Sequence, residues 1–240
     1  DGTEKSVSGY TAVADNPKYP VDSSVEFSGS ATVSETNAGT YTKVLESSQF
    51  KNINKNFTNV RFVVNDPVKL EINPRQVTLT SASDHKTYDG TALTNHNVTE
   101  GGEDGFVTGE GAAYDVTGTI TNVGEADNDF TYTLKDNTLA SNYNITKGLG
   151  KLRIDSVTDK VTVTITGNTK SVIYDGNEHD AVGYTSSISN KLYTAADFKF
   201  NGSAQVKGTN AKDSYPMGLK ATDFENLSKN FTNVEFVVKS

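Results

Sequence analysis

The sequence FKNINKNFTNVRFVV at residues 50–64 recurs as FENLSKNFTNVEFVV at residues 224–238, and this repeat indicates the architecture. The two copies lie 174 residues apart. Similarity at a fixed spacing is the signature of tandem modules, each built from one supersecondary unit. Residues 1–73 and 156–240 are therefore two copies of one module, called type A here.

Residues 74–155 form a more distant copy, called type B. Its Tyr88-Asp89-Gly90 matches Tyr174-Asp175-Gly176, and its Asn122-Val123-Gly124 matches Asn37-Ala38-Gly39. The order is A–B–A, with about 80 residues per unit, and the units are numbered module 1 to module 3. By this register module 1 is expected to lack its first strand.

Short strands are predicted in every module because apolar residues alternate with threonine or charged residues. Val161, Val163 and Ile165 alternate with threonines, and Val60, Phe62 and Val64 show the same period of two. Seven or so short strands per module predict an all-β fold of tandem, antiparallel immunoglobulin-like sandwiches. Residues 37–41 are typical of a turn followed by a corner tyrosine.

A short helix is predicted before the last strands of each type A module. Phe224, Leu227 and Phe231 follow a helical spacing, as do their counterparts Phe50, Ile53 and Phe57. Thr222 and Glu225 fit a capping box at its start. We expect the apolar stripe to face the core and Asn226 to face outward. A β-grasp fold, which packs a helix on a sheet, is the alternative.

Composition excludes several classes of function. The net charge of -8 argues against nucleic acid and against anionic lipid, because both are bound mainly through Lys and Arg. No apolar run is long enough to cross a membrane, and the absence of cysteine excludes disulfides and thiolate metal sites. We expect a monomer within a longer protein, without nucleic-acid or membrane partners.

The repeated motifs carry a family resemblance. Lys86–Gly90, Ile173–Gly176, the Asn-x-Gly turns and Gly150–Ile154 resemble the MBG and YDG repeat modules of adhesins on Gram-positive bacteria, especially gut bacteria. The resemblance implies an extracellular, surface-displayed array with an adhesive or spacer role, and it names no ligand. Lys212 departs from the pattern because it replaces the turn glycine in module 3.

The Tyr-Asp-Gly motif is interpreted as a structural turn. In such a turn the aspartate accepts hydrogen bonds from backbone amides, the glycine takes a positive φ, and the tyrosine packs. The residues concerned are Tyr88, Asp89, Gly90, Tyr174, Asp175 and Gly176.

A candidate ligand face is predicted where the type A modules repeat the same polar details. Its residues are Asn56, Thr58 and Asn59 of module 1 and Asn230, Thr232 and Asn233 of module 3. Recent duplication explains the identity equally well. The leading hypothesis is binding of a host protein or a mucin glycan, with a sheet edge as the contact. The alternatives are a superantigen-like protein that binds immunoglobulin and a passive stalk without a ligand.

No enzyme, cofactor or metal site is predicted, because no set of acid, base and nucleophile is recognisable. His85, His96 and His179 are interpreted as solvated loop residues. The acidic segment 125–129 could offer oxygens to calcium, but it lacks the order of an EF-hand, and a solvated loop is favoured. An isopeptide bond from Lys86 or Lys170 stays open.

Overall fold

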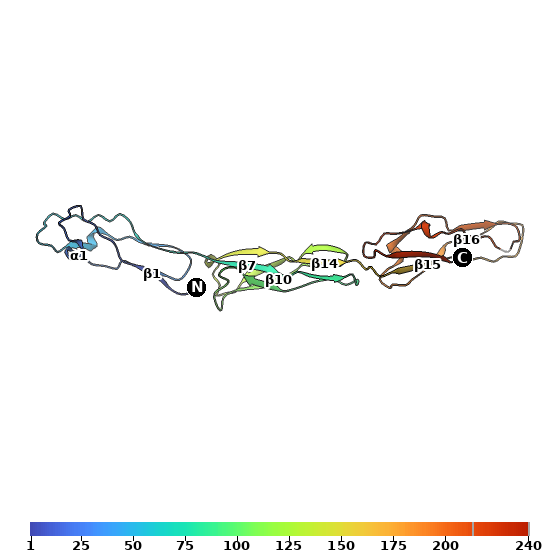
Figure 1. Cartoon of the computed structure of the whole chain (residues 1–240), viewed down its shortest axis with the longest axis horizontal. Helices are drawn as coiled ribbons and strands as arrows, with labels where there is room; N and C mark the ends of the chain where they lie inside the picture. The colour runs from blue at the N-terminus through green and yellow to red at the C-terminus, as the bar shows by residue number, and fades with distance from the viewer. Residues whose placement is uncertain (213, 240) are drawn as a thin grey trace. The chain divides into compact units, whose positions relative to one another are not determined.

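The computed structural model describes residues 1–212 and 214–239 (Figure 1). The chain consists of short strands joined by turns, which confirms the all-β prediction. The α-helix α1 covers only Val21–Ser24, and four single 3-10 turns precede strands elsewhere in the described residues. In that part of the chain no helix is long and apolar enough to span a membrane.

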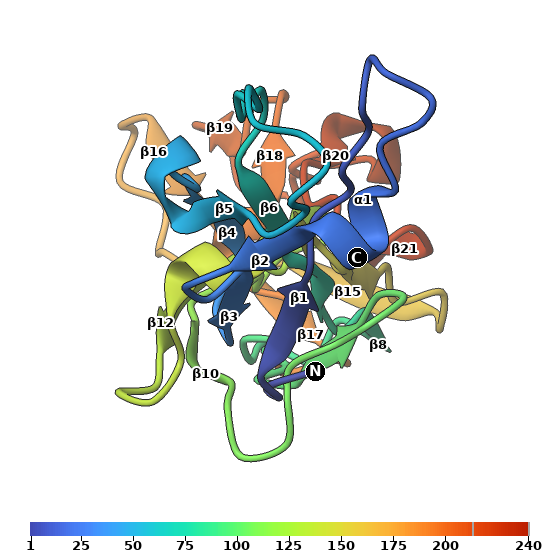
Figure 2. The ribbon, with the colours of Figure 1, turned by 90° about the vertical axis from the view of Figure 1, so that its left-hand side faces the viewer.

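Module 1 forms three two-stranded antiparallel sheets. In Figure 2, β2 and β5 lie side by side near α1. Gly39 at the start of β4 pairs with Ile72 at the end of β6. The pairs are β1 (Lys5–Ser8) with β3 (Thr32–Glu35), β2 (Val25–Phe27) with β5 (Phe50–Asn52), and β4 (Gly39–Lys43) with β6 (Val68–Ile72).

Module 2 has eight strands in three sheets. The first sheet has the order β13-β7-β9, the second β11-β14-β8, and the third pairs β10 with β12. The strands are β7 (Arg75–Ser81), β8 (Asp84–Thr87), β9 (Val98–Gly101), β10 (Ala112–Val116), β11 (Gly124–Asp127), β12 (Phe130–Leu134), β13 (Tyr143–Gly148) and β14 (Lys151–Asp155).

Module 3 repeats the plan with a three-stranded sheet of order β17-β15-β21 and two strand pairs, β16 with β19 and β18 with β20. Its strands are β15 (Val161–Gly167), β16 (His179–Val182), β17 (Tyr184–Ile188), β18 (Phe198–Phe200), β19 (Gln205–Gly208), β20 (Phe224–Asn226) and β21 (Val234–Lys239). Every strand pair among the described residues joins strands of a single module.

Three strand pairs among the described residues are parallel, which the prediction of purely antiparallel sandwiches missed. The first strand of module 2, β7, pairs with the late strand β13, and β15 of module 3 pairs with β21 in the same way. The third parallel pair is β8 with β14. Parallel neighbours need a long crossover, and the residues between the first and last strands of a module provide one.

By compactness the chain divides into two units, and the division passes through module 2. Unit 1 comprises residues 1–80, 98–115 and 131–148, and unit 2 comprises 81–97, 116–130 and 149–240. Module 1 thus shares a unit with part of module 2, and module 3 shares a unit with the rest. The contacts described below all lie within one unit or the other.

The predicted helix is wrong. Phe224–Asn226 is strand β20, and only a single 3-10 turn at Ala221–Asp223 precedes it. Leu227 is 55% exposed, whereas Asn226 is half-buried and donates through Nδ2 to the Phe231 carbonyl at 2.9 Å. The helical spacing of the three apolar residues misled the prediction, because pairing with β18 holds this segment extended.

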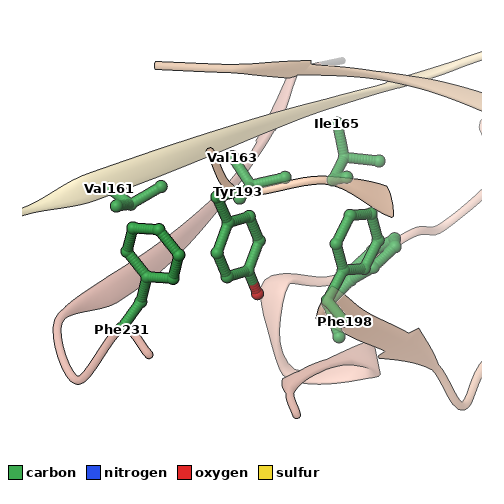
Figure 3. Packing of buried hydrophobic residues seen from close by; sticks show 7 residues of the cluster. Val161, Val163, Ile165, Tyr193, Phe198 and Phe231 are labelled. Atoms are coloured by element: carbon green, nitrogen blue, oxygen red, sulfur yellow. The ribbon is translucent and has the colours of Figure 1, made fainter. Parts of the chain in front are cut away.

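A core of seven buried residues lies in module 3. Val161, Val163 and Ile165 of β15 cover an aromatic cluster that includes Tyr193, Phe198, Phe224 and Phe231 (Figure 3). In unit 2 a smaller core of Leu93, Leu152 and Ile154 belongs to module 2. These thin cores fit the low hydrophobic content of 34%.

The corner tyrosine predicted in module 1 forms its hydrogen bond. The Tyr41 hydroxyl donates to the carbonyl oxygen of Asn37 at 3.1 Å, and Tyr215 donates to the Asn210 carbonyl at 2.9 Å. Each tyrosine thereby holds the turn that precedes it, a device known from sandwich folds.

Candidate functional site

The Tyr-Asp-Gly turns have the predicted geometry. Asp89 accepts a hydrogen bond from the Thr91 amide at 2.9 Å, and Asp175 accepts one from the Asn177 amide at 2.9 Å. Gly90 and Gly176 have φ angles of 80° and 81°, a region that glycine enters without strain. Asp1 bonds Thr3 in the same way, so the motif forms one turn in three places.

The tyrosines of the two motifs differ in their surroundings. Tyr88 packs edge-on against Phe231 with ring centres 5.6 Å apart, and its amide donates to the Asp155 carbonyl at 2.9 Å. Tyr174 is 63% exposed, so the expectation that it packs is wrong. The ring that contacts Tyr88 belongs to module 3, and none of the described aromatic rings is recorded against Tyr174.

A pair of hydrogen bonds from one asparagine joins successive modules, and it occurs twice. Asn142 of module 2 accepts from the Ala38 amide at 2.7 Å and donates to Asn37 Oδ1 at 3.0 Å. Asn230 of module 3 accepts from the Val123 amide at 2.9 Å and donates to Asn122 Oδ1 at 3.2 Å. We call this arrangement the asparagine clamp. It gives the Asn-x-Gly turns a role that the sequence did not reveal.

Replacement of Asn230 by alanine should release the Val123 amide. The expected result is faster hydrogen exchange at Val123, by about fivefold to tenfold, because one net hydrogen bond contributes about 1 kcal/mol. Exchange measured by NMR on the full chain tests this. Exchange at Ala38, which Asn142 holds in the other unit, should stay unchanged, and an unchanged rate at Val123 would contradict the clamp.

In module 3 the candidate ligand face is already occupied by the chain itself. Thr232 donates to the Val157 carbonyl through its amide at 3.1 Å and through its hydroxyl at 3.3 Å. Asn233 Nδ2 donates to the Thr158 carbonyl at 3.1 Å. Because Asn230 belongs to the asparagine clamp, the side chains of all three residues of the face are hydrogen-bonded to other groups of the protein.

In module 1 the same face is free. Asn56, Thr58 and Asn59 are exposed, and their side chains form no hydrogen bond with any described residue. The predicted ligand face is therefore engaged within the chain in module 3 and has no side-chain hydrogen bond to the described residues in module 1.

Two of the turn aspartates carry lowered pKa values. The Asn177 amide and the His179 ring lower the pKa of Asp175 to about 2, and the Nε2–Oδ1 distance to His179 is 2.9 Å. Lys86 and Thr91 hold the pKa of Asp89 well below its usual range. Ionised aspartates are thus preferred in the folded turns.

The pKa of Asp175 should rise toward 3.8 when His179 is replaced by alanine. Because the folded pKa is depressed, the turn gains stability that is present above pH 3.8 and lost as pH falls through about 2. A carboxyl-detected NMR titration of the full chain measures both values. An Asp175 that titrates identically in the two proteins would show that His179 has no part in the turn.

The acidic segment of module 2 is not a loop. Gly124–Asp127 is strand β11, and Asp127 pairs with Lys151 at 2.5 Å, so the loop interpretation is wrong for this stretch. The described residues contain no group of three side chains suited to a metal ion. A polar hollow of about 470 Å³ lies on the β8-β14-β11 sheet, and its lining is Ser83, Asp84, His85, Glu125, Lys151, Arg153 and Asp155.

The histidines and Lys86 lie in ordered positions. His85 is on β8 and His179 is on β16, so only His96 lies in an exposed loop as predicted. Lys86 Nζ contacts Asp89 Oδ1 at 2.7 Å and Thr91 Oγ at 2.6 Å, and no asparagine is among its partners in the described residues.

Sequence reasoning missed Asn128, which is fully buried in module 2. Its Nδ2 donates to the carbonyls of Ala82 at 2.9 Å and Asn95 at 2.8 Å, and its backbone carbonyl accepts from Ser81 Oγ at 2.6 Å. The asparagine sits among acidic residues, so nothing in its sequence context marked it as buried.

No protein-family model matches the chain, and neither a curated protein nor a solved structure is significantly similar to it.

Proposed function

We propose that this chain is the tandem-repeat region of an adhesin on a bacterial cell surface and that it binds a host protein or glycan. The observation that carries the proposal is the group of exposed polar side chains on the candidate ligand face of module 1. Asn56, Thr58 and Asn59 of module 1 are exposed and unbonded to described residues, whereas their counterparts in module 3 are engaged. Amides and hydroxyls of this kind are able to bind the polar groups of either ligand class.

The absence of a recognisable catalytic set supports a binding role over an enzymatic one. Among the described residues, the carboxylate–histidine pair Asp175 with His179 stabilises a turn. We therefore propose that the chain has no catalytic activity. We also propose that it acts outside the cell by binding.

The full chain should bind immobilised immunoglobulin or mucin in surface plasmon resonance, and Thr58→Val with Asn59→Ala should weaken that binding about tenfold. The estimate assumes two lost hydrogen bonds of about 0.5–1 kcal/mol each. Asn137→Ala in module 2, an exposed asparagine outside the face, is the control. Binding to immunoglobulin alone would favour the superantigen-like alternative, and binding that survives the double substitution would refute the assigned face.

The asparagine clamp favours a spacer as the second candidate function. The same two hydrogen bonds recur between module 1 and module 2 and between module 2 and module 3. A repeated contact between neighbours is what a stalk needs, since it restricts motion at each linker. If the chain binds neither immunoglobulin nor mucin, the spacer becomes the preferred function.

A further inference from the structure

An asparagine followed by glycine occurs once in the chain, at Asn201-Gly202, directly after strand β18 of module 3. Both residues are exposed. In such a pair the backbone nitrogen of the glycine reaches the side-chain carbonyl carbon of the asparagine easily, because glycine has no Cβ to hinder the approach. The attack closes a cyclic imide, and its rate depends on how freely the two groups meet.

The backbone amide of Gly202 is available for this attack. It forms no hydrogen bond with the described residues, whereas the neighbouring Asn201 amide donates to the Asp223 carbonyl at 2.7 Å. Asn201 Nδ2 donates to Glu225 Oε2 at 3.2 Å, but both side chains are exposed, so water replaces this bond when it breaks. The fold therefore opposes the rotation that brings nitrogen and carbon together only weakly.

Packing requires the glycine at position 202. A Cβ on Gly202 would lie 2.9 Å from Cε2 of Phe200 and 3.1 Å from Cβ of Asp223, and both distances are too short for a side chain to fit without a shift. The fold thus selects the residue type that also makes the preceding asparagine reactive.

Module 1 has the same turn with an unreactive residue. Its Ser28 amide donates to the Gln49 carbonyl at 2.8 Å, as the Asn201 amide does to Asp223, and Gly29 follows as Gly202 does in module 3. Serine has no side-chain amide to lose. Module 1 therefore provides an internal comparison in which the turn is kept and the reactive group is absent.

Other asparagines are held in place by their neighbours. Asn37 precedes a small residue, Ala38, but the Ala38 amide donates to Asn142 Oδ1 at 2.7 Å. Asn128 is fully buried, and its Nδ2 donates to two backbone carbonyls. Attack at these positions requires hydrogen bonds to break, so they should react more slowly than Asn201.

We propose that Asn201 is a site of spontaneous deamidation in the folded protein. The Gly202 nitrogen bonds to Asn201 Cγ and gives its proton to solvent, while the Cγ–Nδ2 bond breaks and ammonia leaves. Water then opens the imide at either of its carbonyls, which yields aspartate or isoaspartate. The net reaction consumes one water and releases one ammonia. This chemistry is independent of the proposed binding function.

The product should loosen the pair of β18 with β20. The amide that donates to Glu225 becomes a carboxylate, and two like charges across a strand pair are destabilising. Lys199 lies opposite Glu225 in the ladder and offsets part of this repulsion. The two strands pair over only three residues, and they carry Phe198 and Phe224 of the module 3 core (Figure 3).

Mass spectrometry of the full chain, incubated in heavy-oxygen water at mildly alkaline pH and digested in acid, tests the chemistry. We expect aspartate and isoaspartate at position 201, each with one heavy oxygen, and a loss of both in Asn201→Gln. The rate should lie within about threefold of that in the free peptide FKFNGSAQ, residues 198–205, because no costly opening is needed.

Two results would overturn the site. One is a rate in the folded chain slower than in the peptide by about tenfold or more, which would mean that the fold protects the pair. The other is aspartate without isoaspartate, because direct hydrolysis of the side chain gives aspartate alone whereas an imide gives both.

Hydrogen exchange in Asn201→Asp, measured by NMR on the full chain, tests the consequence. The Leu227 amide, which donates to the Asp197 carbonyl at 2.8 Å, should exchange up to about fivefold faster, and added salt should reduce the difference. Asn201→Ser, which introduces the residue of module 1, should leave Leu227 unchanged. So should the Ile53 amide of module 1 stay unchanged in both variants. An unaltered Leu227 in Asn201→Asp would refute the loosening of the strand pair.

Discussion

Phe231→Ala should lower the free energy of unfolding of module 3 by about 3–5 kcal/mol. The ring is 1% exposed, lies under Val161 of β15, and meets Tyr193 and Tyr88 edge-on at 5.3 Å and 5.6 Å. Removing it leaves a cavity that neighbours from two modules line, and such a site collapses poorly.

Hydrogen exchange of the β15 amides, measured on the full chain, gives this local free energy. Leu227→Ala is the matched control because Leu227 is 55% exposed. This variant should lower the free energy of unfolding by less than about 1 kcal/mol. If Phe231→Ala lowers the free energy of unfolding as little as the control does, the aromatic cluster does not stabilise the module.

Asn128→Ala should lower the stability of module 2 by about 2–4 kcal/mol. The asparagine is fully buried, and its Nδ2 is the donor for the carbonyls of Ala82 and Asn95. An alanine leaves both carbonyls without that donor, and each buried, unsatisfied acceptor costs about 1–3 kcal/mol. The opening free energy of the Ala82 amide, which donates to the Asn97 carbonyl, reports the loss.

Asn137→Ala is the control in the same module. Asn137 also donates its Nδ2 to a backbone carbonyl, that of Gly109 at 2.7 Å, but it is exposed, so water replaces the lost bond. We expect a loss below about 1 kcal/mol for this variant. Equal losses for the two asparagines would contradict the view that burial makes Asn128 important.

The repeat and its turns were predictable from the amino-acid sequence. The match between residues 50–64 and 224–238 reappears in three dimensions as paired aromatic distances, for example 4.9 Å and 4.8 Å for Phe27–Phe50 and Phe200–Phe224. The turns at Asp89 and Asp175 were also predictable, because an aspartate followed by glycine satisfies its hydrogen bonds within three residues. Local interactions of this kind are visible in local sequence.

Features that depend on partners distant in the sequence were not predictable and became visible in the folded structure. Phe224, Leu227 and Phe231 have the spacing of a helix, but pairing of β18 with β20 keeps Phe224–Asn226 extended, and Leu227 after the strand is exposed. The parallel ladder of β15 with β21 joins residues about 70 positions apart, and the asparagine clamp joins Asn230 to Val123 across 107 positions. The alternation of apolar and polar residues determines which side chains share a face of a strand. It does not determine which strand pairs with that strand, because the pairing depends on burial summed over the module.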